Sequence, residues 1–276
     1  MMNTKVAIQG IKGSFHYIVA QDYFGIPATV LECLTFDALV DSLLEEKTDT
    51  AVMALENSIA GSIIPNYALI DRHNLQIVGE YYLDIQHHLM VLPGQTIEDI
   101  NEVHSHPMAL LQCKDFFRNY PHLKLVEAKD TADVARQISE GQLQGIAAIA
   151  SKAAADIFEL SVLAESIQTI KHNETRFVIV KRHLDTQDAN IIDKASLKFE
   201  LSAQRGSLAT VLNVMSDCKL NLTKIQSLPI IETPWKYAFF VDATFEDYLH
   251  FKKAKSILQI MADNFKILGE YKNARL

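Results

Sequence analysis

Hydrophobic and polar positions alternate along the first two thirds of the chain in blocks that predict strands and helices in turn. Short apolar runs typical of buried strands cover residues 5–9, 50–55 and 145–150. Between them lie stripes at helical spacing, such as Phe36, Leu39, Val40, Leu43 and Leu44. This alternation predicts an α/β fold with parallel sheets and with ligand sites at the carboxyl ends of the strands.

The same pattern divides the chain into a body and a tail. Residues 81–160 are expected to form a second lobe, after which a strand at 177–181 returns to the first lobe. A polar stretch at 183–194 is the expected linker. Residues 195–276 then follow the order strand, helix, strand, strand, helix, strand, which is the ferredoxin-like βαββαβ pattern. We therefore expect one domain at 1–183 and another at 195–276.

Composition narrows the possible partners. The chain has 276 residues and 49% hydrophobic residues, enough to bury the cores of about two domains. A net charge of −8 argues against a nucleic-acid or anionic membrane partner, since both need clustered Lys and Arg. No uninterrupted apolar run is long enough to span a bilayer. Three scattered cysteines without metal-ligand spacing favour a reducing compartment, so we expect a cytoplasmic protein.

Thr175 and Arg176 are candidate site residues, because they directly precede the apolar run at 177–180. Arginine offers a permanent charge and a donor fork suited to a carboxylate, and the threonine hydroxyl can donate to a reacting oxygen. On this stretch alone, an edge strand with an ordinary surface arginine is the favoured interpretation.

Other segments supply further polar groups where elements begin or end. A glycine turn at 10–13 leads into Ser14 and a helix, yet it is neither a Walker loop nor a dinucleotide fingerprint. Glu56, Asn57 and Ser58 follow a buried strand, where an Asx turn is an equally good interpretation. The pair at 87–88 is interpreted as buried, hydrogen-bonded histidines, because no companion ligand lies at metal-site spacing.

Taken together, five motifs carry a family resemblance. They are Gly10-x-x-Gly13-Ser14-Phe15, Glu56-Asn57-Ser58-x-x-Gly61-Ser62, His104-Ser105-His106-Pro107 with Gln112-Cys113, Ala147-Ala148-Ile149-Ala150, and Asn173-x-Thr175-Arg176-Phe177. In order and approximate spacing they resemble those of prephenate dehydratases, and the tail resembles an ACT domain. The resemblance covers the chain from about residue 5 to residue 275.

This resemblance implies a two-lobed, periplasmic-binding-protein-like catalytic domain followed by an ACT domain. The implied activity is the decarboxylating dehydration of prephenate to phenylpyruvate in phenylalanine biosynthesis, a carbon–oxygen lyase reaction without cofactor or metal. Thr175 would donate to the leaving hydroxyl and Arg176 would clamp a carboxylate. Glu56 is ambiguous, since its carboxylate would repel the substrate dianion unless it faces a donor or stays protonated. The implied residues that orient substrate are Asn57, Ser58, Ser105, Gln112, Ser14 and Phe177.

The ACT resemblance implies inhibition by L-phenylalanine at a subunit interface, and hence a homodimer or homotetramer. The implied contacts are Gly206, Ser207, Leu208, Asn221, Leu222 and Ser227. The chain departs from its relatives at Gln226-Ser227-Leu228-Pro229, where they commonly have Glu-Ser-Arg-Pro, and at Met108, where they often have Gln. Two alternatives stay open: an arogenate dehydratase, and a non-catalytic small-molecule sensor.

Overall fold

The computed structural model describes residues 4–25, 28–183, 189–202, 204–230, 233 and 236–275. The chain divides into two compact units. The first unit comprises Met1–Gly61 and Tyr82–Phe177, and the second comprises Ser62–Tyr81 and Val178–Leu276. Each unit is thus made of two separate segments of the chain. The predicted domains, 1–183 and 195–276, are instead continuous segments, and their boundaries stay a prediction. Part of the predicted linker, 184–188, lies outside the described residues.

The first lobe of the first unit is a parallel sheet covered by helices. Strand β1 pairs in parallel with β2 and β3. These strands and the helices around them are β1 (Lys5–Gln9), β2 (Thr29–Cys33), β3 (Thr50–Asn57), α1 (Phe15–Phe24) and α2 (Phe36–Leu44). The side chains of Ser14 and Thr35 accept hydrogen bonds from the first turns of α1 and α2, which explains where both helices begin.

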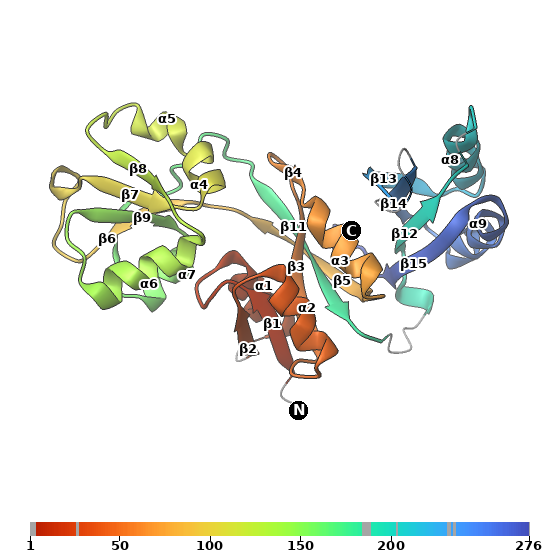
Figure 1. The fold of residues 1–276 in the computed structure, drawn as a ribbon, viewed down its shortest axis with the longest axis horizontal. Coiled ribbons are helices and arrows are strands. Elements are labelled where there is room, and N and C mark those ends of the chain that lie inside the picture. Colours follow the sequence, from red (N-terminus) through yellow and green to blue (C-terminus); the bar gives the residue numbers. More distant parts are fainter. Residues whose placement is uncertain are drawn as a thin grey trace. The chain divides into compact units, whose positions relative to one another are not determined.

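The second lobe of the first unit is a five-stranded sheet in the order β10-β6-β9-β7-β8 (Figure 1). Its strands are β6 (His88–Val91), β7 (Glu102–Ser105), β8 (Lys124–Glu127), β9 (Ile146–Ala150) and β10 (Ser161–Ala164). β7 is parallel to β8 and β9, but β6 is antiparallel to both of its neighbours. The prediction of a purely parallel sheet is therefore wrong here: β6 brings the chain into the lobe directly from β5 (Gln76–Asp84), without a crossover helix.

Helices cover both faces of this second sheet (Figure 1). They are η1 (Ile97–Asp99), α4 (Pro107–Gln112), α5 (Lys114–Phe117), α6 (Thr131–Gly141) and α7 (Lys152–Ile157). Residues of α6 and α7 pack into one apolar cluster, and residues of α4 and α5 pack into another. The lobe thus has a three-layer α/β core.

The second unit contains the predicted βαββαβ order. Besides parts of β5 and β11 (Glu174–Lys181), its elements are α3 (Ile64–Arg72), η2 (Ala189–Ile191), β12 (Lys194–Glu200), α8 (Ser207–Asp217), β13 (Asn221–Pro229), β14 (Tyr237–Thr244), α9 (Tyr248–Met261) and β15 (Asp263–Tyr271). The four strands lie in the antiparallel order β13-β14-β12-β15, as in ferredoxin-like sheets, and β15 pairs in parallel with β5. Phe199, Phe251 and Leu258 are fully buried in the core between this sheet and its two helices.

Two further observations bear on the site. β11 (Glu174–Lys181) begins three residues before the predicted 177–181 strand, so Thr175 and Arg176 lie inside it. The two-residue strand β4 (Gly61–Ser62) pairs with β3.

Within the described ranges, no helix is both long and apolar enough to cross a membrane.

Candidate active site

The site forms where the end of β3 meets the beginning of β11. The Ser58 backbone N–H donates to the Glu174 carbonyl at 2.8 Å, and the Glu174 N–H donates to Ser58 Oγ at 2.9 Å. Ser58, a predicted substrate contact, therefore joins the two strands. Because of this pairing, polar residues that are about 116 positions apart in the chain are brought together at the junction.

Asn57 is the centre of this polar group. Its Oδ1 accepts from the backbone N–H groups of Ile59, at 3.0 Å, and Ala60, at 2.8 Å. Its Nδ2 donates to Asn173 Oδ1, at 2.7 Å, and to Thr175 Oγ1, at 2.9 Å. A backbone N–H can only donate, so these bonds fix which end of the Asn57 amide is oxygen.

This orientation determines what the Thr175 hydroxyl can do. Thr175 is 7% exposed, and its oxygen accepts the Asn57 hydrogen bond. A hydroxyl has one proton to donate, and that proton takes no part in this bond. Asn57 thus holds Thr175 as a donor to some other acceptor. The structure brings these two predicted catalytic residues together.

The network continues to Gln112 and His87. Asn173 Nδ2 donates to Gln112 Oε1 at 2.9 Å, and His87 Nε2 lies 3.0 Å from the same oxygen. Burial lowers the pKa of His87 to about 4, so its ring is neutral at neutral pH. The prediction of a buried, hydrogen-bonded His87 is confirmed. Asn173 was not among the predicted site residues, although it belongs to the motif that contains Thr175.

The predicted glycine turn packs against the second lobe. Gly13 has φ +87°, and a Cβ there would lie 2.9 Å from Ala154 Cα, so only glycine fits. The Gly13 carbonyl accepts from Ser151 Oγ at 2.6 Å. Ser14 is 3% exposed, and its Oγ accepts from the Tyr17 N–H at 3.2 Å as the cap of α1. Ser14 thus has a structural partner, and its contact with substrate stays a prediction.

Ser105 and Phe177 are each packed into the fold. Ser105 is fully buried, and its hydroxyl donates to the Ile149 carbonyl at 2.7 Å. Phe177 is 1% exposed and lies edge-on to the ring of His16, with centroids 4.9 Å apart. Both residues therefore support the site from the core, and their predicted substrate contacts stay predictions.

Arg176 and Glu56 lie on the other side of the strands. Successive side chains of a strand point to opposite faces, so each lies on the face opposite to its neighbour in the Asn57–Thr175 pair. Arg176 is 4% exposed, and Glu56 is half-buried. The arginine is thus held inside the protein, and the roles predicted for these two residues stay predictions.

The residues predicted to bind a regulator all lie in the second unit. Gly206, with φ +86°, is the N-cap of α8, and the Ser207 hydroxyl donates to the Gln204 carbonyl at 2.9 Å. The side chains of Leu208 and Leu222 pack against the core of this unit. Asn221 and Ser227 are exposed on β13, the outer strand of its sheet. Their contact with a ligand stays a prediction.

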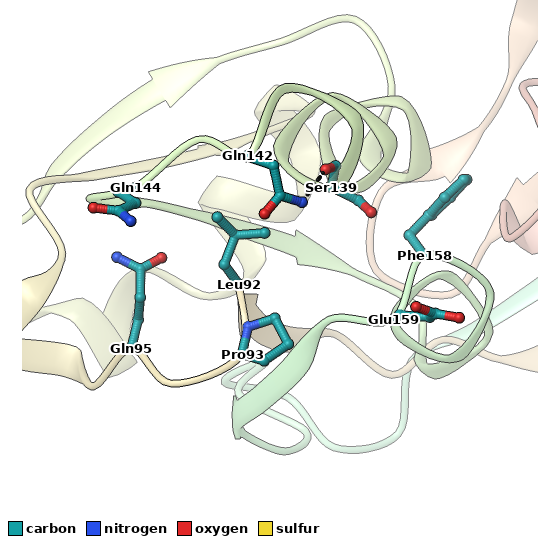
Figure 2. A pocket seen from close by; sticks show the side chains of 8 residues that line it. All are labelled: Leu92, Pro93, Gln95, Ser139, Gln142, Gln144, Phe158 and Glu159. Atoms are coloured by element: carbon teal, nitrogen blue, oxygen red, sulfur yellow. Dashed lines mark hydrogen bonds between the residues drawn. The ribbon is translucent and has the colours of Figure 1, made fainter.

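A pocket of about 310 Å³ lies elsewhere in the second lobe, as Figure 2 shows. It is lined by Leu92, Pro93, Gln95, Ser139, Gln142, Gln144, Phe158 and Glu159. None of these residues belongs to the network of Asn57 and Thr175. Across the described parts of the chain, no group of three or more His, Cys, Asp or Glu side chains could hold a metal ion.

The fold and the site define a class of protein. It has a two-lobed α/β body, in which a threonine hydroxyl is oriented as a hydrogen-bond donor, followed by a βαββαβ domain. The prephenate dehydratase family model matches residues 6–185, and the chain belongs to this family. It is 35% identical to "Arogenate dehydratase/prephenate dehydratase 2, chloroplastic" of Arabidopsis thaliana, over 97% of this chain and 72% of that one. The family resemblance is confirmed.

Solved structures agree with this fold. A prephenate dehydratase of Arthrobacter aurescens, crystallised in complex with L-Phe, matches with a TM-score of 0.88 and 25% identity, over 98% of this chain and 90% of that one. GqqA, described as a novel type of quorum quenching acylase, matches with a TM-score of 0.88 and 26% identity, over 98% of both chains. The predicted fold class, two α/β lobes and a ferredoxin-like domain, is confirmed.

Proposed function

We propose that this chain converts prephenate to phenylpyruvate, the decarboxylating dehydration in phenylalanine biosynthesis. In this carbon–oxygen lyase reaction the ring C–O bond and the bond to the ring carboxylate break, and the substrate takes up one proton while water and CO₂ leave. Aromatisation drives the reaction, so it needs no cofactor. The observation that carries the proposal is the Thr175 hydroxyl, oriented by Asn57 as a donor.

Thr175 would donate its hydrogen bond to the departing hydroxyl. A threonine hydroxyl is a weak acid near neutral pH, so it stabilises the developing negative charge and does not give up its proton outright. The side chains linked to it through hydrogen bonds, Asn57, Asn173 and Gln112, are neutral amides, which add no negative charge to repel a dianionic substrate. A preorganised donor of this kind is typically worth about 10²–10³ in kcat.

Arg176 would supply the cation for a substrate carboxylate, for which its long side chain must reach from its own face of β11 to the side of Thr175, with Glu56 as an acceptor on the adjoining strand. The planar guanidinium group of arginine can donate two parallel hydrogen bonds to one carboxylate, whereas the ammonium group of lysine acts as a point charge. Replacing Arg176 with Lys should therefore raise KM for prephenate. An unchanged KM together with a lower free energy of unfolding would make Arg176 a structural residue.

The test compares hydroxyl-bearing and hydroxyl-free side chains at position 175. The wild-type chain, treated with a chelator, should convert prephenate to phenylpyruvate, followed by absorbance. Thr175→Val should lower kcat by about 10²–10³, while Thr175→Ser should keep most of it. Equal rates for the Val and Ser variants would contradict the role of the hydroxyl, and an inactive wild type would contradict the function.

Arogenate is the second candidate substrate, because the Arabidopsis relative carries both activities in its name. Parallel assays of the same preparation on prephenate and arogenate would decide between them by the ratio of kcat/KM values. A non-catalytic sensor is the remaining alternative. The directed donor at Thr175 argues against it, since binding alone does not require a donor at a leaving group.

We further propose that the βαββαβ domain is an ACT domain through which L-phenylalanine inhibits a homodimer or homotetramer. The L-Phe complex of the Arthrobacter relative supports this regulation. Adding L-phenylalanine to the full chain should lower turnover and release heat in calorimetry, whereas L-alanine should do neither. Absence of both effects would leave the domain without this role.

A cytoplasmic location fits the three buried, free cysteines.

A further inference from the structure

We propose that His87 is a positioning residue of the active site: its Nε2–H group holds the Gln112 side-chain oxygen and so keeps the Gln112 NH₂ group free to donate to the substrate. This inference rests on the proposed dehydratase function and adds a residue to its binding site. It follows from the direction of each hydrogen bond in the network, traced from a fixed starting point.

Two backbone N–H groups donate to Asn57 Oδ1 and so fix the orientation of this amide. They make the other end of the amide Nδ2, which donates to Asn173 Oδ1 at 2.7 Å. The opposite end of Asn173 is then Nδ2, which donates to Gln112 at 2.9 Å. The atom of Gln112 that receives this bond must be its oxygen. The orientation of Gln112 is thus set by amide groups that are distant from it in the chain.

Gln112 Oε1 receives a second contact, from His87 Nε2 at 3.0 Å. Since the oxygen can only accept, His87 Nε2 must carry a proton. With both lone pairs of Oε1 engaged, the two N–H groups of Gln112 Nε2 remain. No partner for them occurs among the residues that the structure describes. They provide two donors suited to a carboxylate or keto oxygen of the substrate.

The neutral Nε2–H tautomer is also the one that the surroundings of His87 favour. His87 is 4% exposed, and its Nδ1 is buried with no partner in the described part of the chain. A proton on Nδ1 would leave a buried donor unsatisfied and set the bare Nε2 lone pair against Gln112 Oε1. Burial lowers the pKa of His87, which keeps the ring neutral.

The rest of His87 is held rigidly. Its backbone N–H donates to Gln168 Oε1 at 3.0 Å, and its carbonyl accepts from the Ile167 N–H at 2.8 Å. Its ring lies edge-on to Phe15, with centroids 5.6 Å apart. A side chain fixed at backbone and ring can hold a partner in one orientation, which is what a supporting residue of a binding site requires.

The kinetic test uses variants that keep or remove the donor. His87→Ala should raise KM for prephenate about tenfold with kcat changed less than about twofold, because a substrate contact is weakened equally in the ground and transition states. His87→Gln places an amide N–H near the Nε2 position and should restore KM to within about threefold. In a Gln112→Ala background, His87→Ala should add less than about a twofold change.

His88→Asn is the matched control. His88 Nδ1 accepts from the Ser166 N–H at 3.3 Å, and an asparagine oxygen can replace that acceptor. This variant should leave KM and kcat close to those of the wild type. If His87→Ala lowers only the free energy of unfolding, or if its effect adds fully to that of Gln112→Ala, the proposal is wrong.

A measurement that needs no turnover separates this inference from the proposed function. The ¹⁵N chemical shifts of the His87 ring in the full chain should show a protonated Nε2 and a bare Nδ1, and Gln112→Ala should weaken that preference. A protonated Nδ1 in the wild type would overturn the inference, whatever the activity. Failure of the wild type on both prephenate and arogenate would instead overturn the function.

Discussion

The network around Thr175 is partly buried and the cluster around Lys194 is fully buried, and the two are built from different side chains. In the first unit, neutral amides and a hydroxyl join Asn57, Asn173, Gln112 and Thr175. In the second unit, Lys194 Nζ lies 2.9 and 2.8 Å from the two carboxylate oxygens of Glu80, and both side chains are 3% exposed or less. Close by on the same strand, β12, Ser196 bonds to Asp242 and Tyr271.

Buried polar side chains thus serve stability in the second unit and the proposed chemistry in the first. The Lys194–Glu80 pair satisfies charges that could not otherwise remain in the interior, and Glu80 Oε1 also accepts from the Ala274 N–H at 3.2 Å. The amide network instead ends in the Thr175 hydroxyl and the Gln112 side-chain NH₂ group, which can donate hydrogen bonds to a ligand. A neutral network can leave such donors without the large desolvation cost of an unpaired charge.

The largest effect is expected from breaking the ionic cluster. Lys194→Met should lower the free energy of unfolding by about 3–5 kcal/mol, because it removes the positive charge and the hydrogen bonds of Lys194 from the buried Glu80 carboxylate. Denaturant unfolding measures this change. Lys47→Met is the control, because the Lys47–Glu45 pair is 62% and 56% exposed and water screens its attraction, so its loss should change the free energy of unfolding far less. Equal losses in the two variants would refute the contrast between buried and exposed pairs.

A smaller effect, on catalysis, is expected from reversing one hydrogen bond of the neutral network. In Asn57→Asp, one carboxylate oxygen can still accept from Ile59 and Ala60, but the other faces Thr175 Oγ1 as an acceptor. The Thr175 proton would then turn toward the introduced carboxylate and away from substrate. We expect kcat to fall about 100-fold, with a folded protein by circular dichroism.

The control for this variant is Asn57→Ser, which removes the amide donor without supplying a carboxylate. It should lower kcat by less than Asn57→Asp, since it loosens Thr175 but does not redirect its proton. If the two substitutions reduce kcat equally, the direction of the Thr175 hydroxyl is not set by residue 57.

Single elements were predictable where local chemistry determines them. The apolar stripe of α2 is largely buried, as its helical spacing predicted, and Thr35 caps this helix. β2 was missed, because only one of its five residues is buried and the segment contains no long apolar run. Asn173 and Asn57 are 116 residues apart, and the strand pairing that joins them is not visible in one sequence. The site residues could therefore be named by motif, but their hydrogen bonds could not.

The effect that is smallest at neutral pH concerns a buried group that is neutral like the amides but can acquire a charge as the pH falls. Burial lowers the pKa of His16 to about 3, and His16 Nε2 accepts from the Ala54 N–H at 3.3 Å. The unfolded chain binds this proton near pH 6.5, so the unfolded state gains protons first as the pH falls. His16 should thus contribute a loss of stability from about pH 6.5 toward about pH 3, with a slope of up to about 1.4 kcal/mol per pH unit. His16→Gln keeps an acceptor for Ala54 and cannot titrate, so its unfolding free energy should depend less steeply on pH in this range. Parallel slopes for the variant and the wild type would show that His16 does not stay neutral in the folded protein.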